Sequence, residues 1–182
     1  ARVIKQDFPN LKIVAGGPHA TIMPEETAKL GIFNFVVKGE GEETFLELIN
    51  NLEKNKSVNK IKGLTFFNKK LVNNPPRELI QNIDLLPFPE RDAIYHKKEY
   101  SPNAFGLLFT ARGCPFQCTY CASNKIWGRK VRFRSPENII KEVILLKNKY
   151  NVKYLKIRDD TFTLNKDRAK NICKLMIKKR LN

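Results

Sequence analysis

The chain has 182 residues, of which 42% are hydrophobic and 29% charged, so it is long enough to bury a core and has an ordinary globular composition. No apolar run approaches the roughly 20 residues that span a bilayer, and the first residues lack the apolar segment of a secretory signal. The formal net charge of +16 would suit an acidic partner such as nucleic acid, but the lysines are scattered, which favours a solvated surface.

Residues 1–73 alternate between short apolar runs and segments with apolar residues at helical spacing. Short runs bounded by glycine or proline predict strands, and apolar residues three or four positions apart predict helices. The expected elements, in chain order, are a strand over 11–15, a helix over 24–30, a strand over 33–37, a helix through Phe45, Leu48, Ile49 and Leu52, and a hairpin over 61–72.

Residues 74–105 interrupt this pattern. The segment Leu86-Pro87-Phe88-Pro89 has prolines at alternating positions, which suits an extended connector and disfavours a helix. We therefore expect a proline-rich linker here. It would separate one domain over residues 1–73 from a second domain over residues 106–182.

The second domain returns to alternating strands and helices. The expected order is a strand over 107–110, a loop that contains cysteines, a helix capped by Ser135, a strand over 152–157 and a helix capped by Asn165. This order predicts right-handed parallel units, and two such units cannot close a barrel. Cys173 lies among the apolar positions of the last helix and is expected to be a core thiol.

Three of the four cysteines, Cys114, Cys118 and Cys121, fall within eight residues. Clustered thiols in a lysine-rich chain without a signal point to a metal site in a reducing cytoplasm. The spacing CxxxCxxC provides three ligands and no nearby fourth, which would leave one iron of a 4Fe-4S cluster open to a further ligand. The alternatives are free thiols, or a structural zinc that would need Cys173 or a histidine as its fourth ligand.

This motif follows an expected strand and has Tyr120 before its third cysteine, and it resembles the radical S-adenosylmethionine (SAM) superfamily. The resemblance implies that the three cysteines hold a 4Fe-4S cluster and that SAM chelates the open iron, with Phe116 and Tyr120 beside it. It also implies contacts to the SAM amino group from Asp159 and Asp160. For these two carboxylates, helix capping or an ion pair with Arg158 is an equal alternative.

The first domain resembles the cobalamin-binding domain that precedes the radical SAM barrel in one large subfamily. The resemblance rests on residues 13–21, residues 37–42 and the Leu86-Pro87-Phe88-Pro89 linker. Glycines after parallel strands let the backbone approach a ligand at the carboxyl end of a sheet. His19 is not expected to bind cobalt, because this subfamily often lacks a histidine ligand. The implied cobalamin contacts are Gly16, Gly17, Gly39, Glu40 and Gly41.

Together, the two resemblances predict an α/β chain: the C-terminal part of a Rossmann-like cobalamin-binding domain, then the first βα units of a partial TIM-type radical SAM barrel. We expect the middle of a longer protein, with strands missing at both ends. The implied function is reductive cleavage of SAM to a 5′-deoxyadenosyl radical, with cobalamin-dependent methyl transfer to an unknown substrate. A reductant such as flavodoxin or ferredoxin is the expected partner, and nucleic acid is possible but not favoured.

Two other functions remain open from the sequence. The first is a cobalamin-free radical SAM enzyme that modifies tRNA, in which the first domain is only a scaffold and the basic charge binds the nucleic acid. The second is a non-enzymatic zinc or electron-transfer module.

Overall fold

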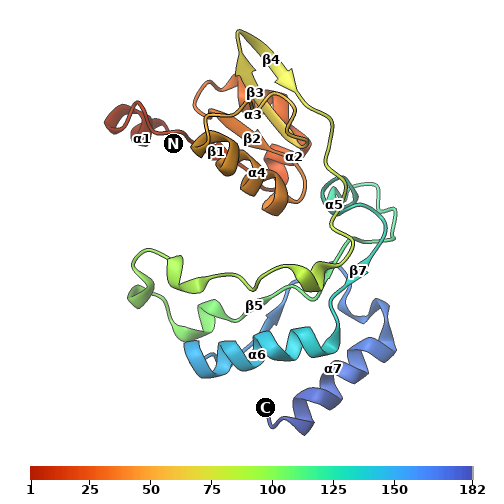
Figure 1. Cartoon of the computed structure of the whole chain (residues 1–182). Coiled ribbons are helices and arrows are strands. Elements are labelled where there is room, and N and C mark those ends of the chain that lie inside the picture. Colours follow the sequence, from red (N-terminus) through yellow and green to blue (C-terminus); the bar gives the residue numbers. More distant parts are fainter. Residues whose placement is uncertain (182) are drawn as a thin grey trace. The chain divides into compact units, whose positions relative to one another are not determined.

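The computed structural model describes residues 1–181 and divides the chain into two compact units (Figure 1). The first unit comprises Ala1–Ile80 with Cys118–Gly128, and the second comprises Gln81–Gln117 with the residues from Arg129 onward. In the described part of the chain, no helix is long and apolar enough to cross a membrane.

A four-stranded sheet in the order β1–β2–β3–β4 forms the centre of the first unit. β1 (Val14–Ala15) pairs in parallel with β2 (Phe35–Val37), and β2 pairs antiparallel with β3 (Leu64–Asn68). β3 pairs antiparallel with β4 (Lys70–Asn73), which confirms the hairpin expected over 61–72. Because β1 and β2 run in the same direction, their carboxyl ends meet at one edge of the sheet.

The helices of the first unit are short, apart from α4. They are α1 (Arg2–Asp7), α2 (Pro18–Ile22), α3 (Pro24–Lys29), α4 (Gly41–Glu53) and α5 (Ser123–Trp127). α3 and α4 confirm the two predicted helices, whereas α1, α2 and α5 are additional. Proline begins both α2 and α3, because the first turn of a helix has no use for the N–H that proline lacks.

β2 is buried along its whole length because helices cover both of its faces. Phe35 and Val37 share one apolar cluster with Leu48 of α4, whereas Val36 packs in another cluster with Ala20 of α2. This alternation follows from the two-residue period of side chains along a strand. The result is a helix–sheet–helix arrangement typical of α/β domains.

The second unit is built from two small strand pairs and two longer helices. Its elements are β5 (Leu107–Leu108), β6 (Ala111–Arg112), β7 (Arg132–Phe133), α6 (Pro136–Tyr150), β8 (Lys156–Ile157) and α7 (Lys166–Lys178) (Figure 1). β5 pairs in parallel with β8, which confirms the parallel unit predicted from the strand–helix–strand order. β6 pairs antiparallel with β7, a pairing that the sequence did not predict.

The predicted caps begin both long helices. The Ser135 Oγ accepts a hydrogen bond from the Asn138 N–H at 3.1 Å at the start of α6. The Asn165 Oδ1 accepts from the Arg168 N–H at 2.9 Å at the start of α7. Each cap satisfies an N–H that has no acceptor within its own helix.

α6 and α7 pack together over β5, but Cys173 takes no part in this core. Leu108, Ile139 and Ile172 form the buried cluster, whereas Cys173 is exposed. The prediction that Cys173 is a core thiol is therefore wrong. Successive helix residues point about 100° apart, so the buried side of α7 runs through Ile172 and leaves Cys173 on the solvent side.

The segment between β4 and β5 contains 3₁₀ turns and no α-helix or strand among its described residues, as its prolines predicted. The turns are η1 (Ile83–Leu85), η2 (Arg91–Ala93), η3 (Lys97–Glu99) and η4 (Pro102–Phe105). Although extended, the segment is not detached, because Arg91 at the start of η2 is buried.

A buried ionic network ties Arg91 to the rest of the second unit. Its Nη2 lies 2.9 Å from the Oε1 of Glu142 in α6, and the Arg134 Nη1 lies 2.6 Å from the other oxygen, Oε2. The Glu142 side chain is only 2% exposed, so both guanidinium groups depend on it for their countercharge. The Arg91 Nε also donates to the carbonyl of Phe105 at 3.0 Å. One carboxylate thus joins the proline-rich segment, the β7–α6 turn and the helix.

Candidate functional site

The three clustered cysteines lie on an irregular loop. The described residues 113–122, which follow β6, contain neither helix nor strand. Cys114 is half-buried and Cys118 and Cys121 are exposed, and all three are free thiols. The division between the two units falls inside this loop, between Gln117 and Cys118. The backbone is therefore not fixed by sheet or helix hydrogen bonds at the positions that carry the thiols.

The three thiols of the loop have the chemistry of a metal site but are not gathered into one. Among the described residues, no three His, Cys, Asp or Glu side chains are gathered closely enough to hold a metal ion. The donor set nevertheless suits iron and sulfur, because it consists of three soft thiols on a short, unpaired loop. The Cys121 N–H donates to the Cys118 carbonyl at 3.2 Å, and the Ser123 N–H approaches the Cys121 Sγ at 3.5 Å.

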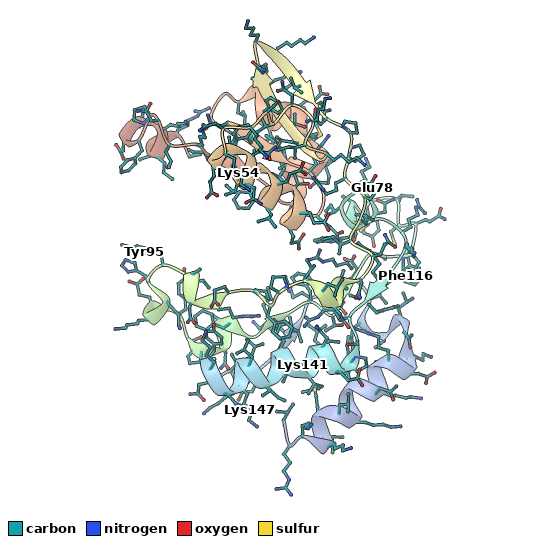
Figure 2. The ribbon with its side chains drawn as sticks, in the orientation of Figure 1. Lys54, Glu78, Tyr95, Phe116, Lys141 and Lys147 are labelled. Atoms are coloured by element: carbon teal, nitrogen blue, oxygen red, sulfur yellow. The ribbon has the colours of Figure 1, made fainter. Side chains whose placement is uncertain are left out.

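The two aromatic residues that the sequence placed beside SAM are open to solvent. Phe116, labelled in Figure 2, is 54% exposed, and Tyr120 is 91% exposed. Both rings belong to the cysteine loop itself. Exposed aromatic rings on a loop are available to stack on a flat ligand, and they are costly to leave in water.

Asp159, a predicted SAM contact, uses both carboxylate oxygens within the protein. Its Oδ1 accepts from the backbone N–H groups of Thr110 at 2.6 Å and Ala111 at 3.1 Å, and its Oδ2 accepts from the Thr110 hydroxyl. Asp159 thus joins the end of β8 to the residues that connect β5 and β6. Its neighbour Asp160 is exposed. The predicted pair therefore has two different environments.

Arg168 completes this arrangement, and the sequence did not single it out. Its Nη2 donates to the Thr110 carbonyl at 2.5 Å and its Nε to the Arg134 carbonyl at 3.1 Å. Burial lowers the pKa of Arg168, and the carboxylate of Asp159 partly offsets that effect by raising it. The sequence signal that could have identified Arg168 is a charged residue on the apolar side of a predicted helix. Glu142 gives the same signal on α6.

The predicted cobalamin-binding glycines meet at the carboxyl edge of the parallel β1–β2 pair. The Thr21 Oγ1 accepts from the Gly39 N–H at 2.9 Å and donates to the Gly17 carbonyl at 2.9 Å, so it joins the two loops. Gly17 and Gly39 have φ angles of 92° and 69°, in the region that favours glycine. A Cβ added at either position would meet nothing within 4 Å. The backbone is therefore open there to the approach of a ligand.

The three other predicted residues of this edge differ in their surroundings. Gly16 is exposed, and Gly41 is the first residue of α4. Glu40 is buried, and its Oε2 accepts from the Ile80 N–H at 2.7 Å. Its carboxylate therefore holds the chain after β4 and does not project from the glycine edge.

Two family models match the chain. Residues 108–181 match the radical SAM superfamily, and residues 1–49 match the B12 binding domain. An uncharacterized methyltransferase of Pyrococcus horikoshii is 42% identical over 175 residues, a match that covers 94% of this chain and 38% of that protein. An anaerobic magnesium-protoporphyrin IX monomethyl ester cyclase of Synechocystis is 29% identical over 177 residues, covering 96% of this chain and 35% of that protein.

The fold is shared with a solved structure. TsrM from Kitasatospora setae, a radical SAM methyltransferase with cobalamin and a [4Fe-4S] cluster bound, matches with a TM-score of 0.77. The match covers 98% of this chain and 36% of that chain at 19% identity, and at this identity it shows the fold alone. It confirms the predicted α/β fold class. The chain spans between 35% and 38% of the length of the two curated relatives.

Proposed function

The chain belongs to the radical SAM proteins that carry a B12-binding domain, and we propose that it is part of an enzyme that cleaves SAM reductively and uses cobalamin for methyl transfer. One observation carries the proposal: a B12-binding match over residues 1–49 precedes a radical SAM match over residues 108–181, and the CxxxCxxC motif lies within the second. Methyl transfer is favoured because the relative at 42% identity is named a methyltransferase.

Cys114, Cys118 and Cys121 are the proposed ligands of a 4Fe-4S cluster. Their spacing, their free thiols and the irregular loop support this role. When bound, such a cluster supplies the electron for the reductive cleavage of SAM. The chain's own part is to present three thiolates and to direct the Ser123 N–H at the Cys121 sulfur, since hydrogen bonds to cluster sulfurs tune the reduction potential.

The proposed SAM contacts are Phe116, Tyr120, Asp159 and Asp160. The two exposed rings suit stacking on adenine. Asp160 is exposed beyond the end of β8, which leaves its carboxylate accessible to an ammonium group, and Asp159 accepts hydrogen bonds from Thr110. A single charge-assisted hydrogen bond, donated by the amino group of SAM and accepted by Asp160, would orient that group.

The proposed cobalamin contacts are Gly16, Gly17, Gly39 and Gly41, whereas the Glu40 carboxylate accepts from the Ile80 N–H. Their place at the carboxyl edge of parallel strands supports the proposal, because ligands of open α/β sheets bind at that edge. We assign this role to a B12-binding domain within residues 1–73 and the SAM chemistry to residues 106–182, joined by residues 74–105. A reductant such as flavodoxin or ferredoxin, in the cytoplasm, is the proposed electron source.

Two single glycine substitutions, one at the proposed site and one control, test the cobalamin site. Gly39→Ala places a methyl group at the proposed ligand edge, so we expect the Kd for hydroxocobalamin to rise at least about tenfold, as for the loss of about 1.4 kcal/mol. Gly31 is a matched control, because it also has a positive φ, 68°, and open space around its Cβ position, but it precedes β2 and lies at the other edge.

Both substitutions should cost similar stability, roughly 1 kcal/mol, because each puts a side chain at positive φ. Titration of the full protein with hydroxocobalamin, followed by its visible spectrum, gives the two Kd values, and thermal unfolding gives the stabilities. Equal Kd values for Gly39→Ala, Gly31→Ala and the unchanged protein would contradict the assignment of the glycine edge.

The radical SAM part of the proposal is tested by its product. The iron-loaded, reduced protein should release 5′-deoxyadenosine from SAM slowly, even without a substrate, because an unused radical takes hydrogen from other donors.

A further inference from the structure

Thr110 is a fully buried polar residue four positions before the first cysteine of the loop. Its side chain and backbone are 0% exposed, and it lies between β5 and β6. Its backbone N–H and its hydroxyl both donate to Asp159. Its carbonyl accepts from the Arg134 N–H at 3.0 Å and from Arg168 at 2.5 Å. Every polar group of Thr110 is therefore bonded, and the partners come from three other segments.

Filling the buried space at position 110 does not by itself require a threonine. A valine has nearly the same shape as threonine and would fill the same space without a hydroxyl that requires an acceptor. The structure instead brings a charged pair to this point: Asp159 on one side of Thr110 and Arg168, 7% exposed, on the other. Burying charged groups is unfavourable unless they are well paired, so such networks commonly fix a geometry.

The network also contains buried N–H groups that have no acceptor in the described part of the chain, and these destabilise the folded state. Arg168 Nη1 and Arg134 Nη2 are buried and have no hydrogen-bond acceptor among the described residues. A buried N–H without an acceptor destabilises the folded state, and in native proteins such groups call for a functional explanation. Both orphaned groups belong to the side chains whose segments bond to the Thr110 carbonyl. The same two arginine residues therefore carry both the unpaired N–H groups and the bonds to the Thr110 carbonyl.

We propose that Thr110 is a positioning residue for the cysteine loop, clamped by Asp159 and Arg168 so that the chain leaves the strand in one direction toward Cys114. The inference rests on the proposed function, because the cysteine loop needs a fixed starting direction only if it binds a cluster. Three ligands must converge on one cluster, and the chain from Cys114 onward has no helix or strand among its described residues until α5. A fixed starting point limits the conformations that the loop must lose when it binds.

The test compares Thr110→Val, which removes only the hydroxyl, with Thr110→Ser, which keeps it. Hydrogen–deuterium exchange of the protein before iron loading should be about tenfold faster at the amides of Thr110, Ala111 and Arg134 in Thr110→Val, because the hydroxyl bond that steadies their hydrogen bonds to Asp159 and to the Thr110 carbonyl is gone. After anaerobic loading, Thr110→Val should hold less iron per chain and show an altered electron paramagnetic resonance spectrum. Thr110→Ser should restore the exchange rate, the iron content and the spectrum.

Unchanged amide exchange, iron content and spectrum in Thr110→Val would overturn the proposal, and so would a spectrum that Thr110→Ser fails to restore. If Thr110→Val does not fold, Arg168→Lys takes its place: it keeps the charge but cannot reach both carbonyls, so it should show the same faster amide exchange at Thr110 and Arg134 and the same spectral change. The wild-type protein separates the two proposals. If it binds no iron, the function proposed above fails, whereas the exchange comparison still tests the clamp.

Discussion

Replacing Cys114, Cys118 or Cys121 with alanine is expected to abolish the 4Fe-4S cluster in each case. Three thiolates are the whole ligand set that the motif offers, so none of the three has a substitute. The measurement is iron and acid-labile sulfide per chain after anaerobic reconstitution, together with the visible absorbance of the cluster. The expected value for each variant is close to zero, against about four irons per chain for the unchanged protein.

The matched control is Cys173→Ala. Cys173 is also a free, exposed thiol, but it lies on α7, away from the motif. Its removal should leave the iron content unchanged. A normal cluster in Cys118→Ala would falsify the ligand assignment, and loss of the cluster in Cys173→Ala would show that a fourth cysteine takes part.

Replacing Glu142 with alanine is expected to cost about 3–5 kcal/mol in the free energy of unfolding. Its carboxylate is the countercharge for both Arg91 and Arg134 in the interior of the second unit. Without it, two guanidinium groups remain buried and uncompensated. The change also frees the proline-rich segment that Arg91 holds. Equilibrium unfolding in urea measures the effect, because the midpoint shifts while the slope reports any change in compactness.

Lys141, labelled in Figure 2, is the control because it precedes Glu142 on the same helix but is exposed. Lys141→Ala should change the free energy of unfolding by no more than about 0.5 kcal/mol. Glu142→Gln should fall between the two variants, since an amide can accept one of the hydrogen bonds but carries no charge. If Glu142→Ala is as stable as Lys141→Ala, the buried network does not stabilise the unit.

Local sequence signals predicted those parts of the fold that depend on neighbouring residues. Ser135 and Asn165 begin helices because their side chains cap N–H groups three positions away. The hairpin of β3 and β4 likewise needs only one turn between adjacent segments. The β6–β7 pairing escaped prediction because it joins residues about 20 positions apart across an irregular loop, and strands of two residues leave little periodic pattern.

The same distinction holds for the candidate sites. The cysteine spacing and the glycine pairs are local motifs, so the sequence alone could single them out. The clamp on Thr110 is not local: its hydroxyl meets Asp159 only because β5 pairs with β8, and Arg168 arrives from α7. Cys173 was misplaced for a related reason, because the spacing of apolar residues on α7 does not by itself say on which side of Ile172 the buried stripe ends.

The most direct test of the radical SAM assignment is whether the protein, loaded with iron and sulfide, cleaves SAM. The full protein is reconstituted with iron and sulfide under anaerobic conditions, its metals are quantified, and it is reduced with dithionite and given SAM. We expect 5′-deoxyadenosine to accumulate in proportion to the bound iron, and none to form with Cys118→Ala. An intact, reduced cluster that leaves SAM uncleaved would contradict the proposal, as would a protein that binds one zinc per chain and no iron.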